Sequence, residues 1–352
     1  MKFLLIRLSS LGDIIHSLPI IYRIRQKYPD AQVDWLTGNK GLELLSLIKE
    51  INNVYLLNLE NLSLIQKQKY DYVIDVQGLF KSALLSKMCL GKKVIGFKNT
   101  REFADIFYDE KIDVGNLFKT KKHIVDMNLE LVETRLIASL PRVDVFCLDE
   151  GPLDKKIKFL IPKISETNKG LLQQTLFSNT TENKKKVIIF PSTTWESKLW
   201  SMDYWFELIK MMSSDFQIYL CASRSDLCFI KSLIDKLDSS KISYINLVGK
   251  TNLNDLIYLI QNVDLVIGLD SAGLHLASAV KNDYETPEVI GIYGPTSPFR
   301  SGPYTSFENT LYLSEMECIA CRKKKCPLGH HKCMNDILPA DLMNMIDRKT
   351  KL

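Results

Sequence analysis

The sequence has 352 residues, of which 46% are apolar, 25% charged and 9% aromatic, the composition of a globular protein rather than a disordered or collagenous chain. At roughly 150 residues per domain, this length favours two domains. Lysine and arginine exceed aspartate and glutamate by five, 46 against 41, which is too small an excess for a dedicated nucleic-acid-binding protein.

Short apolar segments alternate with amphipathic helical segments, and this alternation predicts parallel sheets in an α/β fold. In the first half, strands are expected at residues 3–8, 33–37, 54–59, 72–76 and 94–97. Residues 14–27 carry apolar side chains at helical spacing, and Pro19 within them is expected to kink that helix.

The alternation lapses at residues 151–186, which are rich in Lys, Ser, Thr and Asn. We therefore expect an interdomain linker there, between domains at residues 1–150 and 187–352. Strands are expected again at residues 187–190, 217–220, 244–248, 265–268 and 289–293. Folds of this kind bind ligands at the carboxyl ends of their strands, so the residues just after each strand are the candidate site residues.

The first strand is followed by Ser9, Ser10, Leu11, Gly12 and Asp13. Gly12 permits a tight turn, and the helix that follows offers free N–H groups to an anion or a hydroxyl oxygen. Alternatively, Ser10 or Asp13 only caps that helix.

A second candidate loop follows the strand at residues 187–190 and contains Thr193, Thr194 and Lys198. Hydroxyl groups and an ammonium group provide the directed donors and the point charge that bind a diphosphate. The loop is not a Walker loop, because it lacks the glycines. The alternative is a solvated turn that caps the next helix.

A third candidate loop follows the strand at residues 265–268. It contains Asp270, Ser271, Gly273, Leu274 and His275. An acid and small residues at the start of a helix predict an anion-binding helix N-terminus. His275 in the first turn could donate to a phosphate, or it could be a packed core residue.

Residues 81–101, here called the basic stretch, contain no Asp or Glu. Their basic residues are Lys81, Lys87, Lys92, Lys93, Lys98 and Arg101. A surface of one sign favours anionic partners, although a solvated basic surface is the plainer interpretation.

Taken in order, these motifs resemble glycosyltransferase family 9, the ADP-heptose:lipopolysaccharide heptosyltransferases. Residues 8–19 look like the N-terminal signature of the family, and residues 73–82 match a further motif in kind. Residues 193–200 are similar to the donor loop of heptosyltransferase I, and residues 270–275 to the second donor motif. The resemblance implies a GT-B fold, with two Rossmann-like domains facing across a cleft. The N-terminal domain would hold the acceptor and the C-terminal domain the nucleotide sugar.

The resemblance also implies an inverting transfer of heptose from ADP-L-glycero-D-manno-heptose to Kdo of the lipopolysaccharide inner core, with Asp13 as general base. Lys198, Thr193, Thr194 and the helix start near Gly273 would stabilise the leaving diphosphate. No cofactor would be required for catalysis, and the chain has no Asp-x-Asp pair of the kind that metal-dependent transferases use.

The remaining site residues implied by the resemblance fall into two sets. The acceptor, the anionic Kdo–lipid A, would contact Ser9, Ser10, Gly12, Lys81, Lys98 and Arg101. The donor would contact Thr193, Thr194, Lys198, Asp270, Ser271, Gly273, Leu274 and His275. Heptosyltransferase I has an acid for the ribose after the strand at 217–220, and this chain departs from that pattern. Asp226 or Ser225 would take its place.

Residues 318–333, here called the Cys-rich segment, contain Cys318, Cys321, Cys326 and Cys333. In a reducing compartment this spacing is closer to a metal knuckle than to a disulfide set, and four thiolates suit Zn or Fe. The sequence therefore predicts a structural metal, with reduced cysteines in a basic loop as the alternative. Similar segments occur among family members, including protein heptosyltransferases that carry a structural iron.

No run of about 18 apolar residues is present that could form a helix across a bilayer. We therefore expect a cytoplasmic protein that contacts the inner membrane peripherally, on its cytoplasmic face, and does not bind nucleic acid. Alternatives are a heptosyltransferase II-like or autotransporter-protein heptosyltransferase, transfer of another nucleotide sugar, or a nucleotide-sugar epimerase. A different class is a metal-binding module that contacts nucleic acid through the Cys-rich segment.

Overall fold

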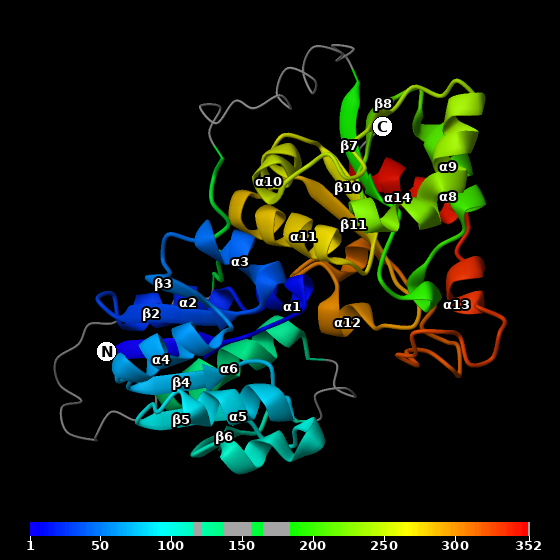
Figure 1. Cartoon of the computed structure of the whole chain (residues 1–352). Helices are drawn as coiled ribbons and strands as arrows, with labels where there is room; N and C mark the ends of the chain where they lie inside the picture. Colours follow the sequence, from blue (N-terminus) through cyan, green and yellow to red (C-terminus); the bar gives the residue numbers. More distant parts are fainter. Residues whose placement is uncertain (116–121, 137–155, 165–183, 351–352) are drawn as a thin grey trace. The chain divides into compact units, whose positions relative to one another are not determined.

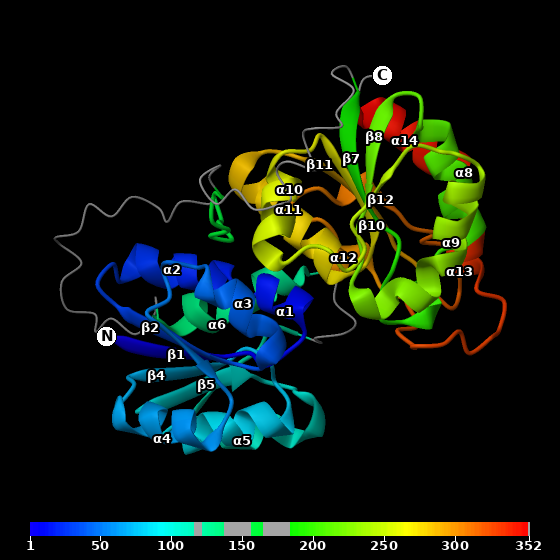
Figure 2. The same cartoon turned by 45° about the horizontal axis from the view of Figure 1, so that its top comes forward.

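The computed structural model describes residues 1–115, 122–136, 156–164 and 184–350. The chain divides into two compact units, Met1–Pro162 and Lys163–Leu352. Each unit is built around one parallel sheet flanked by helices (Figures 1 and 2). This architecture confirms the predicted α/β class of two Rossmann-like domains.

Unit 1 contains a six-stranded sheet of order β3-β2-β1-β4-β5-β6. Its strands are β1 (Lys2–Ile6), β2 (Gln32–Thr37), β3 (Asn53–Leu56), β4 (Tyr72–Asp75), β5 (Lys93–Phe97) and β6 (Glu110–Ile112). All neighbouring strands pair in parallel. The order reverses between β1 and β4, and this switch point is where open α/β sheets bind ligands.

The helices of unit 1 cover both faces of its sheet (Figure 2). They are α1 (Leu11–Ile15), α2 (Pro19–Lys27), α3 (Asn39–Ser46), α4 (Leu59–Lys67), α5 (Phe80–Met88) and α6 (Ile124–Leu136), with the 3-10 segment η1 (Arg101–Phe107). The helices α4 and α5 pack apolar side chains, among them Leu62, Ile65 and Leu85, against the buried strand residues of one face. The helices α2 and α3 lie over the other face (Figure 2).

Unit 2 contains a six-stranded sheet of order β12-β11-β10-β7-β8-β9. Its strands are β7 (Lys185–Phe190), β8 (Phe216–Leu220), β9 (Ile245–Asn246), β10 (Leu265–Leu269), β11 (Glu288–Ile292) and β12 (Thr310–Leu311). Counted from the first strand of each unit, both sheets have the order 3-2-1-4-5-6. The switch point of unit 2 therefore lies between β7 and β10.

The helices of unit 2 also form two layers. They are α8 (Met202–Met212), α9 (Leu227–Ser239), α10 (Leu253–Gln261), α11 (Ala272–Tyr284), α12 (Pro298–Ser301), α13 (Lys332–Asn335) and α14 (Pro339–Thr350), with η3 (Glu196–Lys198), η4 (Arg224–Asp226) and η5 (Phe307–Asn309). Helices α8, α9 and α14 bury Trp205, Leu233 and Ile346 against one face of the sheet. Helices α10 and α11 lie on the other face (Figure 1).

Two local predictions need correction. Pro19 does not kink one long helix: α1 ends at Ile15 and a separate helix begins at Pro19, because a proline at the first helical position has no N–H that the helix would use. The short edge strands β6 and β12 were not predicted, since three and two residues carry no recognisable alternation. No helix among the described residues is long and apolar enough to cross a membrane.

Candidate functional site

Asp13 lies in α1, the helix that follows β1. Its Oδ2 atom lies 2.8 Å from Nη2 of Arg7 and accepts hydrogen bonds from the N–H of Ser10 at 3.1 Å and from the Ser10 hydroxyl at 2.9 Å. No hydrogen bond to Oδ1 comes from the residues that the structure describes, and the side chain is 39% exposed. One carboxylate oxygen is thus anchored while the other keeps its acceptor capacity.

The environment of Asp13 keeps this carboxyl ionised at neutral pH. Burial favours the neutral form, but the charge of Arg7 and the hydrogen bonds from Ser10 outweigh burial, so the pKa of Asp13 lies below its ordinary value of 3.8. Arg7 is itself held by a 2.7 Å bond to the carbonyl oxygen of Val76. The hydrogen bond from the N–H of Ser10 to Asp13 is also half of a capping box. Asp13 therefore caps the helix through Oδ2 and keeps Oδ1 as an acceptor. Ser9 and Ser10 are exposed and Gly12 is buried.

The motif at residues 73–82 contributes a buried carboxyl group at the end of β4. Asp75 accepts hydrogen bonds from the N–H of Gln77 at 2.8 Å, from the hydroxyl of Ser82 at 2.8 Å and from the hydroxyl of Tyr108 at 2.7 Å. Burial raises the pKa of Asp75 above its ordinary value. The side chain of Gln77 in turn accepts a 2.8 Å hydrogen bond from the N–H of Leu8. This motif therefore fixes the turn after β4 to the loop that leads to Asp13.

The basic stretch is largely paired with acids from other segments. The pairs are Lys87–Asp109, Lys92–Asp71, Lys93–Glu110 and Lys98–Asp113. The expectation of a surface of one sign is therefore wrong, because folding brings acids beside most of these lysines. Lys98 lies 3.2 Å from Asp113, and both side chains are about half exposed; such pairs are weak and exchange readily. Lys81 is exposed with no carboxylate partner among the described residues, and the side chain of Arg101 lies outside them.

In unit 2, Asp270 follows β10 and collects the polar side chains of two neighbouring loops. Its Oδ2 atom accepts from Nζ of Lys198 at 2.7 Å and from the hydroxyl of Thr296 at 2.6 Å, and Oδ1 lies 3.1 Å from Nε2 of His275. The hydroxyl of Thr193 donates to the backbone oxygen of Asp270 at 3.1 Å. The structure thus brings together four of the predicted donor residues at the switch point.

This cluster is almost dry. The side chains of Asp270, His275 and Lys198 are 6%, 9% and 14% exposed. Burial favours the neutral form of Asp270, but the charge of Lys198 and the hydrogen bond with His275 hold its pKa well below the ordinary value. Lys198 also lies over the ring of Trp195, at 4.6 Å from the centroid. Asp270 therefore fixes the direction of the ammonium group of Lys198 and the imidazole of His275.

The first turn of α11 offers backbone N–H groups beside this cluster. Ser271 is the N-cap, and Gly273 is half-buried. A Cβ atom at Gly273 would lie 2.8 Å from Cδ1 of Phe190, so glycine lets the helix pack closely on β7. Leu274 is only 1% exposed, which makes its side chain part of the core. Thr194, in the loop after β7, has an exposed side chain.

Asp226 lies in η4, beyond the carboxyl end of β8. Its Oδ2 atom accepts from the hydroxyl of Ser192 at 3.1 Å and from the hydroxyl of Ser223 at 2.8 Å. Ser225 is exposed, and its hydroxyl pairs with that of Ser223 at 2.7 Å. Asp226 therefore joins the turn after β8 to the loop after β7.

Sequence reasoning missed Arg7, Ser192 and Thr296. Each of them follows a strand of one of the two sheets. Thr296 follows β11 in the run Gly294-Pro295-Thr296, and Arg7 directly follows β1. Their position after a strand was the available signal. Their partners could not be found without the fold.

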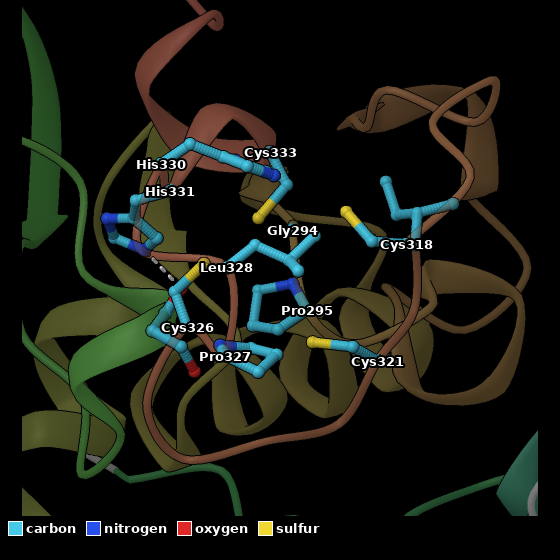
Figure 3. Close-up of a pocket in the computed structure, with 12 residues that line it drawn as sticks. Gly294, Pro295, Cys318, Cys321, Cys326, Pro327, Leu328, His330, His331 and Cys333 are labelled. Atoms are coloured by element: carbon cyan, nitrogen blue, oxygen red, sulfur yellow. Dashed lines mark hydrogen bonds between the residues drawn. The ribbon is translucent and has the colours of Figure 1, made fainter.

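The four cysteines of the Cys-rich segment line one pocket (Figure 3). Among the described residues, no three or more His, Cys, Asp or Glu side chains are grouped so that they could hold a metal ion, and Figure 3 shows the sulfurs on different sides of the pocket. The predicted structural metal is therefore not supported, because ligand sulfurs must all approach one point to about 2.3 Å. The backbone N–H of His331 lowers the pKa of the Cys326 thiol, whereas burial raises that of Cys333 to about 11.

The Cys-rich segment also holds the loop after β7 through Ser197. The N–H of Ser197 donates to the backbone oxygen of Lys324 at 3.1 Å, and its hydroxyl donates to that of Lys323 at 2.5 Å. Nε2 of His331 lies 2.6 Å from the backbone oxygen of Ser197. Because Lys198 is the next residue, these three bonds fix the backbone from which its ammonium group extends.

Comparison with known proteins gives a consistent picture. The model of glycosyltransferase family 9 (heptosyltransferase) matches residues 63–332. Lipopolysaccharide heptosyltransferase 1 of Campylobacter coli is 29% identical over 329 residues, which cover 88% of this chain and 89% of that protein. Lipooligosaccharide heptosyltransferase 2 of Campylobacter jejuni is 26% identical over 335 residues, covering 94% and 92%. The structure of Escherichia coli heptosyltransferase WaaC with ADP is similar with a TM-score of 0.71 at 21% identity, covering 99% of this chain and 100% of that one.

Proposed function

The chain belongs to glycosyltransferase family 9, the heptosyltransferases, whose model matches 270 of its 352 residues, and on this premise we propose that it transfers heptose from ADP-L-glycero-D-manno-heptose to Kdo of the lipopolysaccharide inner core. Relatives named heptosyltransferase 1 and heptosyltransferase 2 match at similar identity, 29% and 26%. Kdo–lipid A is the proposed acceptor, and a heptosylated core is the second candidate.

The observation that carries the proposed mechanism is the state of Asp13. Its carboxylate is ionised, partly exposed and oriented through Oδ2, which leaves Oδ1 to accept the proton of the attacking Kdo hydroxyl. Loss of that proton as the new bond forms, while the bond to ADP breaks, is a single displacement that inverts the anomeric centre. Ser9, Ser10 and Gly12 of the same loop would line the acceptor. Lys81, Lys98 and Arg101 would contact its carboxylates and phosphates.

The proposed donor site is the cluster at the switch point of unit 2. Lys198, the exposed Thr194 and the N–H groups at the start of α11 are directed donors for a diphosphate, and Asp270 and Thr193 position them. Asp226 would accept a ribose hydroxyl. Because these groups supply hydrogen-bond donors and an ammonium group for the leaving ADP, we propose that catalysis needs no divalent metal. The acceptor domain is then unit 1 and the donor domain unit 2.

Such an enzyme would act in the cytoplasm, on a lipid acceptor at the cytoplasmic face of the inner membrane. The test is ADP release from ADP-heptose in EDTA, with Kdo2–lipid A, with its heptosylated form, and with no acceptor. We expect release only with Kdo2–lipid A. Release with the heptosylated form alone would make the protein a heptosyltransferase II, and release that needs no acceptor would indicate hydrolysis or epimerase-type chemistry.

The matched variants for this assay are Asp13→Asn and Asp203→Asn. Asp13→Asn keeps the shape of the side chain but removes its basicity, so kcat should fall by about 10²–10⁴-fold with little change in the KM for ADP-heptose. Asp203 lies in the first turn of α8, where its side chain is 69% exposed, and its variant should retain full activity. An Asp13→Asn enzyme with near wild-type kcat would exclude Asp13 as the base.

A further inference from the structure

Large apolar side chains are exposed at high density on one part of unit 1. Of the 16 exposed large apolar residues among the described residues, seven fall within residues 79–106. They are Leu79, Phe80, Leu84, Met88, Leu90, Phe103 and Ile106. Scattered apolar residues are normal on a protein surface, but a contiguous group marks a site of interaction.

Helix α5 carries an apolar stripe on its outer surface. Phe80, Leu84 and Met88 are 43%, 40% and 42% exposed, and their spacing of four residues places them along one side of the helix. At 100° per residue, Lys87 lies on one edge of this stripe and Lys81 on the other. The opposite side of α5 is buried against the sheet. A surface helix normally presents polar residues outward, so α5 departs from the pattern of a helix that faces only water.

The segment η1 extends the same surface. The rings of Phe80 and Phe107 meet edge to face with centroids 5.3 Å apart, and the N–H of Phe80 donates to Oε2 of Glu102 at 3.2 Å. On η1, Phe103 is 79% exposed and Ile106 is 65% exposed. We call Phe80, Leu84, Met88, Phe103 and Ile106 together the α5–η1 face.

Backbone strain accompanies two of the most exposed apolar side chains. Phe103 has φ 56° and Leu90, just beyond α5, has φ 54°. This left-handed region suits glycine or asparagine, and a bulky residue there is strained. An exposed Phe or Leu at such a position is unfavourable for both its backbone and its contact with water. Burial of these side chains against another surface would offset that cost.

The charges beside the stripe indicate what covers it. The charged residues of α5 are Lys81 and Lys87, on either side of the apolar stripe. Lys81 has no carboxylate partner among the described residues, and Lys87 forms an exposed pair with Asp109, of a kind that exchanges readily. Apolar side chains that enter the boundary of a bilayer, with lysines left at the phosphates, form the pattern of an interfacial helix.

We propose that the α5–η1 face docks on the surface of an anionic lipid bilayer. This inference rests on the proposed function, since a lipid-linked acceptor would be presented there. Phe80 begins α5 only a few residues after Gln77, whose side chain binds the N–H of Leu8 in the loop that leads to Asp13. Docking through this face therefore brings the carboxyl ends of β1 and β4, where Asp13 lies, close to sugars at the membrane surface.

The test is vesicle flotation of the full chain with three proteins. The wild type is compared with the quadruple variant Leu84→Gln, Met88→Gln, Phe103→Asn and Ile106→Gln, in which asparagine suits the left-handed backbone of position 103. The control variant carries Leu227→Gln and Phe229→Gln in α9, where the side chains are 45% and 52% exposed. The vesicles contain phosphatidylethanolamine and phosphatidylglycerol, or phosphatidylcholine alone.

We expect the wild type and the control to float with the anionic vesicles and the quadruple variant to bind at least about tenfold more weakly. Binding to phosphatidylcholine vesicles should be weak for all three proteins. Equal flotation of the quadruple variant and the wild type would overturn the proposal, as would a loss of binding in the control of the same size.

Two further measurements separate this proposal from the proposed function. With a water-soluble, deacylated Kdo acceptor, the quadruple variant should retain kcat/KM within about twofold, since its substitutions lie outside the reaction site. Normal transfer to this acceptor without membrane binding by the wild type would refute the docking face and leave the transferase intact. Sedimentation without lipid gives the remaining outcome: a wild-type dimer that the quadruple substitution dissociates would assign the face to a second copy instead.

Discussion

Replacing Asp270 by Asn removes one charge from the cluster at the switch point of unit 2 and keeps the size of the side chain. Lys198, only 14% exposed, then keeps its ammonium group without a carboxylate partner. Breaking a buried ion pair by removing one partner costs about 3–5 kcal/mol, because an uncompensated charge remains in a dry site. We therefore expect the free energy of unfolding of the Asp270→Asn variant to fall by that amount at neutral pH.

The pH dependence provides an independent test of the same cause. The pKa of Asp270 is lowered in the folded protein relative to its ordinary value of 3.8. The stabilisation is therefore fully present above about pH 5 and is lost as the pH falls toward the folded-state pKa. The difference between wild type and variant should be constant from about pH 5 upward. Below pH 3.8 it should shrink by up to about 1.4 kcal/mol per pH unit.

Urea unfolding followed by tryptophan fluorescence measures this difference, because three of the four tryptophans, Trp195, Trp200 and Trp205, belong to unit 2. Asp203→Asn is the control, since Asp203 pairs with Lys236 at the surface and its loss should cost less than about 1 kcal/mol. A loss in Asp270→Asn as small as in the control, or a difference that does not change in acid, would refute the buried-pair argument.

Three further predictions concern other parts of the two units. Gly273→Ala places a Cβ atom 2.8 Å from the ring of Phe190 and should lower the unfolding free energy by about 1–3 kcal/mol; calorimetry with an unchanged Tm would contradict this. Because the pKa of Asp13 is lowered, Asp13 should stay ionised between about pH 8 and pH 5, and its protonation should cause no loss of kcat in that range. A fall in kcat toward pH 5 that is absent from Asp13→Asn would contradict this. His331→Ala removes the 2.6 Å contact with Ser197 and should raise the KM for ADP-heptose by about 2–12-fold in steady-state assays. An unchanged KM would mean that this contact does not position the loop after β7.

The central strands could be predicted because a parallel strand covered on both faces is a continuous apolar run. The run at residues 187–190 is such a case and lies within β7. The edge strands β6 and β12 could not be predicted, since their pairing partners, not their own composition, make them strands. Pairing also neutralised the basic stretch: β5 and β6 pair with Ile95 opposite Glu110, and this places Glu110 within reach of Lys93.

The same reasoning explains how far the site could be predicted. Lys198 and Asp270 were each found because they follow a strand, but their contact depends on β7 lying beside β10, which no local pattern reveals. The Cys-rich segment shows the opposite limit. The spacing of its cysteines predicted a metal site, yet spacing does not determine where the sulfurs point, and the described residues form no such group.

The repeated strand order has a consequence for how such enzymes diversify. Asp13 follows the first strand of one sheet and Lys198 follows the first strand of the other. In the proposed mechanism, the same position in the same topology therefore serves proton transfer in one unit and phosphate binding in the other. Each half holds its own chemistry on its own scaffold. With the donor in unit 2 and the acceptor in unit 1, as proposed, a change of nucleotide sugar would arise in the second half and a change of acceptor in the first, without rebuilding the partner half. Exchanging whole halves between relatives is the natural way to recombine these specificities.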